Sequence, residues 1–254
     1  MTERVILITG ASGGLAQAIV SQLSSSDQLI LLGRDRKKLE KLYGKRQQTV
    51  FYTCDITDEK EVAQLIEKIY QRFGHIDILI NNAGFGSFKS YDTYTDAEIR
   101  DMFAVNTFAV MLFSRLVGER MAKAGHGHIV NVASMSGLIA TSKTSIYSAS
   151  KFAVIGFSNS LRLELADKQV YVTTVNPGPI RTDFFDTADP SGHYLKSVER
   201  FVLSPEMVAT KIISILGKNK REVNLPLLLN FAYKAYTLFP KTADFLSRKV
   251  FNFK

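Results

Sequence analysis

A phenol and a primary amine lie four residues apart at Tyr147 and Lys151. On a helix this spacing places both side chains on one face. A phenol with a pKa of about 10 is a weak acid–base catalyst at neutral pH, but a neighbouring ammonium stabilises the phenolate and lowers that pKa. We therefore expect the two residues to handle protons as a pair. Taken alone, they also fit a surface Tyr and Lys on an amphipathic helix.

A glycine-rich turn follows the first apolar run of the chain. It extends from Thr9 to Ala16 and opens a stretch with helical periodicity. Such a turn aims backbone N–H groups at a pyrophosphate without a Cβ in the way, and the helix start adds partial positive charge. A plain tight turn would use the same glycines. The phosphate-binding residues that the turn predicts are Gly10, Ser12, Gly13, Gly14 and Leu15.

Charged residues follow the second apolar run, which ends at Gly33. An acid at the tip of this strand would accept hydrogen bonds from an unphosphorylated ribose, whereas a cation there meets a 2′-phosphate. Because Arg34 directly follows the expected tip, NADPH is favoured over NADH. Two alternatives stay open: Asp35 turns in to bind the ribose, or the basic run 36–38 is a solvated helix start.

These groups need a scaffold, which the alternation of the chain predicts. Short β-branched runs alternate with longer stretches of helical periodicity, a pattern typical of parallel strands joined by crossover helices. The expected strands are 4–9, 28–32, 49–53, 76–80, 128–133, 170–176 and 222–225. The expected helices are 14–24, 36–43, 58–73, 100–124, 147–167 and 205–216. We expect one α/β domain of the doubly wound, Rossmann type, with about seven parallel strands flanked by helices and its ligands at the carboxyl ends of the strands.

Composition agrees with this fold and argues against several classes of protein. The chain has 254 residues, of which 46% are hydrophobic, enough for one large core. The single cysteine, Cys54, excludes an intramolecular disulfide and fits a reducing compartment, so we expect a cytoplasmic protein. Cys54 itself is expected to be a buried small hydrophobe rather than a redox group.

No targeting, membrane-spanning, nucleic-acid or metal signature stands out. The apolar run 5–8 is too short for a signal peptide, and no segment offers about 18 unbroken apolar residues. The net charge of +8 is dispersed along the chain, without a helix-turn-helix signature, an RNA-binding aromatic motif or paired Cys/His spacing. We expect no nucleic-acid partner and no metal.

Four motifs, taken in order, resemble the short-chain dehydrogenase/reductase family. That family carries a Thr-Gly-x-x-x-Gly-x-Gly turn, an Asn-Asn-Ala-Gly segment, a Ser upstream of a Tyr-x-x-x-Lys, and a Pro-Gly after the sixth strand. The matching positions are 9–16, Asn81 to Gly84, Ser134 before Tyr147 and Lys151, and Pro177-Gly178, within a match that covers 4–226. The resemblance implies an NADP(H)-dependent oxidoreductase that transfers a hydride between the nicotinamide and a carbonyl or secondary alcohol of a small, lipophilic molecule.

The resemblance also implies catalytic roles. Tyr147 is similar to the general acid that protonates the carbonyl oxygen, and the hydroxyl of Ser134 polarises that oxygen. Lys151 would tune the phenol and hold the nicotinamide ribose. Asn106 matches an asparagine that positions a water for proton relay. Without the family, Asn106 fits a helix-kinking or internally satisfied polar residue.

Cofactor contacts carry over in the same way. Asp55 is similar to an acid that contacts the adenine amino group, although it also fits a turn before a helix, and Thr182 matches a hydroxyl near the carboxamide. The remaining implied cofactor contacts are Ile56, Asn82, Ala83, Gly84, Tyr147, Lys151, Pro177, Gly178 and Ile180. Two positions depart from the family: Ala16 replaces the usual third glycine, and Gly13 replaces a frequent Ser, which adds backbone freedom but loses a phosphate hydrogen bond.

Two segments after the sixth strand bear on substrate and partners. The long connection 179–204 is expected to be a lid, whose Phe184, Phe185 and Tyr194 suit an apolar substrate or pack on their own loop. The basic, amphipathic segment 227–254 is expected to form a helical extension to a domain at 1–226. It would cover the pocket, contact a subunit or make peripheral contact with an anionic membrane, the first two being favoured.

Assembly and rival functions complete the expectations. The expected helices 100–124 and 147–167 resemble those that pair subunits in the family, so we expect a homodimer or homotetramer. The rivals to a soluble carbonyl reductase are a non-catalytic NADPH-binding regulator and a membrane-surface reductase of lipid substrates. The regulator is disfavoured because Ser134, Tyr147 and Lys151 are all present.

Overall fold

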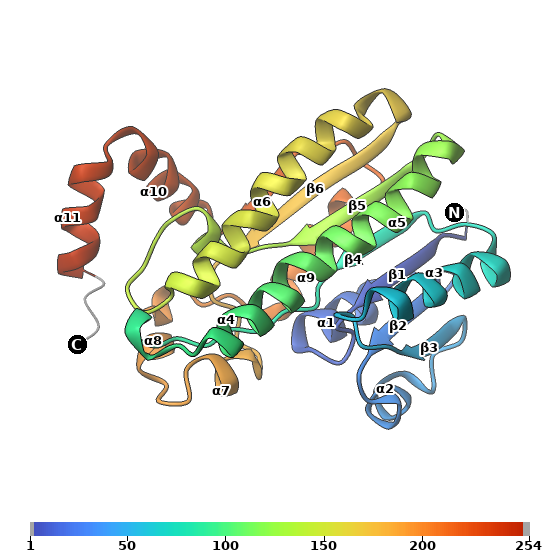
Figure 1. Ribbon diagram of the computed structural model, residues 1–254, viewed down its shortest axis with the longest axis horizontal. Helices are drawn as coiled ribbons and strands as arrows, with labels where there is room; N and C mark the ends of the chain where they lie inside the picture. The colour runs from blue at the N-terminus through green and yellow to red at the C-terminus, as the bar shows by residue number, and fades with distance from the viewer. Residues whose placement is uncertain (1–2, 251–254) are drawn as a thin grey trace.

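Seven apolar runs of the sequence form the strands of one parallel sheet (Figure 1). The structure is a computed structural model that describes residues 3–250. Its strands are β1 Val5–Thr9, β2 Gln28–Gly33, β3 Thr49–Thr53, β4 Ile78–Asn81, β5 Gly127–Val132, β6 Val170–Pro177 and β7 Glu222–Leu225. They lie in the order β3-β2-β1-β4-β5-β6-β7. The predicted doubly wound fold is confirmed, and the strand order reverses between β1 and β4.

Helices cover both faces of the sheet. Their bounds are α1 Gly14–Gln22, α2 Arg36–Tyr43, α3 Glu59–Phe73, α4 Asp96–Phe103, α5 Ala109–Ala124, α6 Ser145–Leu165, α7 Phe184–Ala188, α8 His193–Ser197, α9 Pro205–Ile215, α10 Leu227–Leu238 and α11 Pro240–Val250. Side chains alternate along β1, so Ile6 and Ile8 pack toward α1 and α9 while Val5 and Leu7 pack toward α3 and α5. Burial on both faces explains why these strands are apolar throughout.

The helix expected at 100–124 begins earlier and is interrupted. Thr95 and Glu98 form a capping box, in which each side chain accepts a hydrogen bond from the backbone N–H of the other, so α4 starts at Asp96. A π-helical segment, Ala104–Phe108, then joins α4 to α5. The interruption holds Asn106, consistent with the helix-kinking role that the sequence left open.

Among residues 3–250, one helical stretch, 96–124, is long and apolar enough to cross a membrane by length and composition. Half of its most apolar window is buried inside the protein. Phe113 and Val117 of α5 lie in the core against β4 and β5. This burial is the pattern of a core helix.

The connection expected at 179–204 holds two short helices and returns to its starting point. The backbone N–H of Arg181 donates to Leu203 O (3.0 Å), and that of Leu203 donates to Pro179 O (2.8 Å). Between these ties the chain forms α7, α8 and a 3₁₀ turn at Glu199–Phe201. The segment is therefore an excursion from the sheet edge, and its role as a lid stays a prediction.

The predicted C-terminal extension forms α10 and α11, which lie at the end of the molecule away from β2 and β3 (Figure 1). It follows a cis peptide bond between Leu225 and Pro226. Residues 251–254 of that extension, and residues 1–2, lie outside the described part of the chain. The division of the chain into a domain at 1–226 and this extension stays a prediction.

One buried histidine makes the stability of this fold depend on pH. His128 of β5 is 1% exposed, and its Nδ1 accepts a hydrogen bond from the Gly217 backbone N–H (3.0 Å). Its Nε2 therefore carries the proton and donates to Thr173 Oγ1 (2.8 Å). Burial lowers the pKa of His128 to about 4.

We expect this histidine to destabilise the fold in acid. Because its folded pKa lies below the ordinary value of about 6.5, the unfolded chain binds more protons between about pH 6.5 and 4, and stability falls by up to about 3 kcal/mol as pH falls through that window. Denaturant unfolding at pH 7 and pH 5 measures the loss. His128→Gln should shrink the difference between the two pH values, whereas exposed His193→Gln should not. An equal difference in all three proteins would contradict the assignment.

Candidate active site

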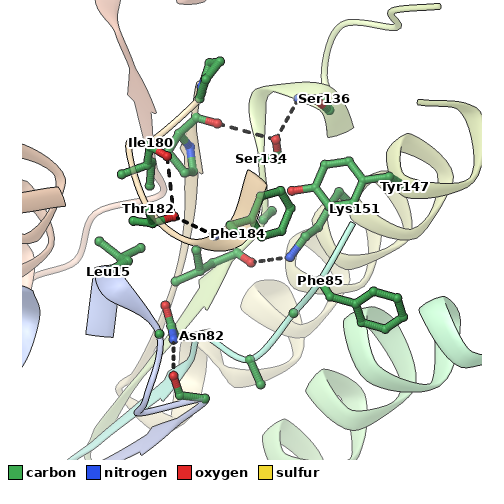
Figure 2. A pocket seen from close by; sticks show the side chains of 18 of the residues that line it. Leu15, Asn82, Phe85, Ser134, Ser136, Tyr147, Lys151, Ile180, Thr182 and Phe184 are labelled. Carbon is green, nitrogen blue, oxygen red and sulfur yellow. Dashed lines mark hydrogen bonds between the residues drawn. The ribbon is translucent and has the colours of Figure 1, made fainter. Parts of the chain in front are cut away.

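A cavity of about 1070 Å³ opens at the carboxyl ends of the strands, where the strand order reverses. Such a switch point is where doubly wound sheets bind ligands. All seventeen predicted cofactor residues and Ser134 line it, and Asn106 is the one predicted site residue that does not. Figure 2 shows side chains that line this cavity and labels ten of these residues.

Two glycines of the turn after β1 sit where a side chain has no room. Gly10 has φ +64°, and a Cβ on it would lie 2.7 Å from Ala83 Cα. A Cβ on Gly14 would lie 2.7 Å from Thr182 Cγ2. Gly13, by contrast, has φ −78°, which any residue adopts, so the conformation at this position does not itself require glycine. The turn is thus held against the segments that follow β4 and β6.

Helix α1 begins directly after this turn, and its first residues line the cavity. Its N-cap, Gly13, supplies no side-chain cap, and the first turn of the helix holds no acidic residue. The first N–H groups of a helix lack intrahelical partners and carry partial positive charge. Ser12 and Leu15 border the same part of the cavity. The residues therefore fit a bound phosphate group. Ala16 is fully buried in the core, where its methyl is accommodated.

The segment after β4 is pinned to the turn by Asn82. Its Nδ2 donates to the carbonyls of Thr9 and Gly10, both at 3.1 Å. The backbone N–H groups of Asn82 and Ala83 donate to Thr9 Oγ1, also at 3.1 Å. The side chain of Asn82 thus shapes the cavity wall at the place where the sequence predicted a cofactor contact.

Arg34 stands at the tip of β2 and lines the cavity. Asp35 does not turn in, because it caps α2 by accepting a hydrogen bond from the Lys38 backbone N–H (3.1 Å). Asp55 Oδ1 accepts from the backbone N–H and the hydroxyl of Thr57, at 2.9 and 2.7 Å. These bonds lower the pKa of Asp55, with Arg34 adding to the effect. Asp55 is therefore a turn residue that also borders the cavity.

Tyr147 and Lys151 project from one face of α6 toward the cavity (Figure 2). The Lys151 amine donates to Val132 O (3.0 Å) and lies 5.9 Å from the centre of the Tyr147 ring. Ser134, at the end of β5, accepts a hydrogen bond from the Ser136 N–H (3.0 Å), and its hydroxyl lies near enough to the Tyr147 phenol to lower the pKa of that phenol. The predicted pair and the predicted serine therefore meet.

The protonation of this pair differs from the expectation. Burial raises the pKa of Tyr147 to about 12, although the hydrogen bond with Ser134 lowers it in part. Burial also lowers the pKa of Lys151 to about 8. The expected lowering of the phenol pKa is not seen, because desolvation of the buried phenolate is the largest influence on that pKa.

Asn106 lies beneath the residues that line the cavity. It is completely buried, its Nδ2 donates to Phe85 O (2.9 Å) and Ser150 Oγ (3.1 Å), and its Oδ1 accepts from the Phe85 N–H (3.0 Å). Its Oδ1 and the Lys151 amine would lie 3.1 and 3.3 Å from a Cβ on Gly84. Asn106 thus ties the segment after β4 to α6, while the predicted water relay stays a prediction.

An aromatic cluster covers the phenol. Phe88 lies 5.5 Å from Tyr147 between ring centres, and 6.4, 6.2 and 4.9 Å from Phe184, Phe185 and Tyr194. The aromatic residues of the 179–204 connection therefore pack on one another, as one of the two alternatives expected, and also line the cavity, while their fit to an apolar substrate stays a prediction. Sequence analysis missed Phe88, whose only signal is its place shortly after the Asn-Asn-Ala-Gly segment.

The end of β6 completes the wall opposite α6. The Ser134 hydroxyl lies 3.5 Å from Pro177 O, and the Gly178 N–H donates to Leu225 O (2.6 Å). Thr182 Oγ1 accepts from the Phe184 N–H (3.4 Å), while Ile180 lines the cavity beside it. Residues from the tail, Leu229 and Tyr236 among them, also line it, in agreement with the favoured expectation that the tail covers the pocket.

The described residues hold no group of three or more His, Cys, Asp or Glu suited to a metal ion. Cys54 borders the cavity but is 4% exposed, and burial raises the pKa of its thiol to about 12. A thiol with so high a pKa carries almost no thiolate at neutral pH and is a poor nucleophile. The expectation of a buried small hydrophobe is confirmed.

Comparisons with known proteins agree with this arrangement. Residues 4–191 match the short chain dehydrogenase family. A 3-ketodihydrosphingosine reductase of Bacteroides thetaiotaomicron is 37% identical over 191 residues, which cover 75% of this chain and 69% of that protein. A short-chain dehydrogenase structure from Streptomyces avermitilis has a TM-score of 0.82 and 25% identity, covering 98% of this chain and 97% of that one.

The structure of ElxO with NADP bound has a TM-score of 0.78 and 26% identity, over 88% of this chain and 97% of that chain. The motifs named from the sequence surround one cavity, and the family match extends over most of the chain. The protein therefore belongs to the short-chain dehydrogenase/reductase family of oxidoreductases.

Proposed function

We propose that this protein is an NADP(H)-dependent reductase of lipophilic ketones or aldehydes. One observation carries the proposal: a phenol, a serine hydroxyl and a buried amine meet in the cavity that also borders the glycine turn and Arg34. When bound, a nicotinamide dinucleotide supplies the hydride for this chemistry.

The chain's own residues handle the proton. With its pKa raised to about 12, Tyr147 stays protonated at neutral pH and donates its proton to the carbonyl oxygen as negative charge develops there. The Ser134 hydroxyl, which lines the same cavity as the phenol, donates to the same oxygen. The Lys151 ammonium stabilises the phenolate that remains.

The lining favours an apolar substrate. Phe88, Phe184 and Phe185 form the cover above Tyr147, and apolar rings gain by excluding water from an apolar ligand. The similar Bacteroides protein is named for reduction of a 3-keto sphingoid, a long-chain ketone. Both observations support a lipophilic carbonyl as the substrate.

Cofactor preference rests on Arg34. Its guanidinium at the tip of β2 is placed for a 2′-phosphate, and the capping role of Asp35 keeps that acid from competing for the ribose. Similar proteins solved with NADP or NADPH bound support the same preference. We also propose a cytoplasmic location, on the ground of the single cysteine.

Subunit pairing is proposed through the helices that the sequence singled out. Phe152 and Leu163 of α6 are 64% and 75% exposed, and Phe108 at the start of α5 is 59% exposed. Large apolar side chains on neighbouring helices favour an interface between copies of the chain.

Replacing the acid should abolish turnover. Tyr147→Phe keeps the ring but removes the transferable proton, so kcat should fall at least about 100-fold while the Kd for NADPH stays within a few-fold. NADPH oxidation with a panel of ketones and aldehydes measures the first, and fluorescence titration the second. Tyr91→Phe, at an exposed phenol outside the cavity, is the matched control. Full activity in Tyr147→Phe would reject the assigned acid.

Removing the cation at the strand tip should change cofactor preference. Arg34→Ala should weaken NADPH binding by about 10- to 100-fold and NADH binding by less than about threefold, because only NADPH has the charged partner. Titration of both dinucleotides measures this difference. Arg36→Ala serves as control, since Arg36 pairs with Glu40 (2.7 Å) on α2. Equal losses for the two dinucleotides would mean that another residue binds the 2′-phosphate.

A charge on the exposed face of α6 should separate the subunits. Leu163→Glu should lower the mass found by size-exclusion chromatography with light scattering, because a buried carboxylate opposes association. Met207→Glu, at an exposed methionine of α9, should leave the mass unchanged. A wild-type chain that is already monomeric would rule out the proposed pairing.

A further inference from the structure

Helix α10 presents two different faces. Leu229, Tyr233 and Tyr236 are half-buried; Leu229 and Tyr236 line the cavity, and Leu229 and Tyr233 pack against a cluster that includes Ile155. Their spacing places them on one side of the helix. This inner face is accounted for by the site already described.

The outer face of α10 is apolar and exposed. Leu227, Phe231 and Leu238 are 69%, 67% and 73% exposed, and their spacing of four and seven residues places them on one stripe opposite the inner face. Leu228 and Phe239 are also exposed. So many large apolar side chains gathered on one short segment mark a surface that is covered in use.

Positive charge around this outer face indicates what kind of surface binds there. Lys234 falls on the same stripe and is exposed, as is Lys241 at the start of α11. The sequence from 227 to 254 holds five basic residues against one acidic residue, Asp244. A second copy of the chain would bring like charges together, whereas an anionic lipid surface offers opposite charge and an apolar layer at once.

We propose that the outer face of α10 docks on an anionic lipid bilayer. Phe231, Leu227 and Leu238 enter the boundary between headgroups and acyl chains, and the lysines pair with lipid phosphates. Because the inner face of the same helix lines the cavity, the bilayer and the cavity are separated by the width of one helix, about 10 Å. Delivery of a lipophilic carbonyl by this route rests on the proposed function; the docking itself does not.

Vesicle co-sedimentation of the full-length protein tests the docking. Vesicles of phosphatidylcholine alone are compared with vesicles in which about a third of the lipid is phosphatidylglycerol. Phe231→Ser removes an outer-face anchor, Lys234→Glu with Lys241→Glu reverses the charge, and Met207→Ser changes an exposed apolar residue on α9 as the matched control. Circular dichroism and the melting temperature check that each variant is folded.

The expected result is binding to anionic vesicles that falls at least about tenfold with Phe231→Ser or the double charge reversal, weakens in high salt and is unchanged by Met207→Ser. Absence of binding to anionic vesicles would overturn the proposal. If the protein is instead a dimer that Phe231→Ser dissociates, a second copy of the chain is the occupant of the outer face. Binding equally strong in all variants would also overturn it. Co-sedimentation does not depend on catalytic activity. A failure of the docking proposal can therefore be distinguished from a failure of the proposed reductase function.

Discussion

The close approach of the turn after β1 to the segment after β4 is the constraint on which the site depends. A Cβ on Gly10 would lie 2.7 Å from Ala83 Cα, and hydrogen bonds from Asn82 to the Thr9 and Gly10 carbonyls hold the two segments in this contact. The strand order brings β1 and β4 together at this edge. The cavity opens at this edge and is lined by the helix start as well as by the acid–base pair.

Burial then decides how the pair works. In water the ammonium of Lys151 would favour the phenolate of Tyr147, but inside the protein desolvation opposes both charges, so the phenol pKa rises and the amine pKa falls. Part of this burial comes from Phe88 and Phe184, whose rings lie 5.5 and 5.8 Å from the phenol ring. Phe88 and the 179–204 connection therefore both contribute to the burial that raises the pKa of the phenol.

Sequence alone was sufficient where local pattern and topology coincide. The apolar runs predicted all seven strands, and the turn from Gly10 to Leu15 and the spacing of Tyr147 and Lys151 predicted residues that the fold brings to one cavity. Prediction from the sequence failed where contacts between segments distant in the chain determine a property. The pKa of Tyr147 depends on burial by residues far along the chain, and the early start of α4 depends on a capping box at Thr95 that the apolar periodicity does not reveal.

Helix α10 has one face packed against the protein and an opposite face that is exposed. The half-buried positions of α10, such as Leu229 and Tyr233, are fixed by packing against the core beside α6, so the opposite stripe is necessarily held outward. Turning that stripe inward would remove Leu229 from the cavity wall and expose Tyr233. The helix therefore cannot hide its outer apolar face by rotation. Only a surface outside this chain can cover that face, and an anionic lipid surface would do so beside the cavity proposed to take a lipophilic substrate.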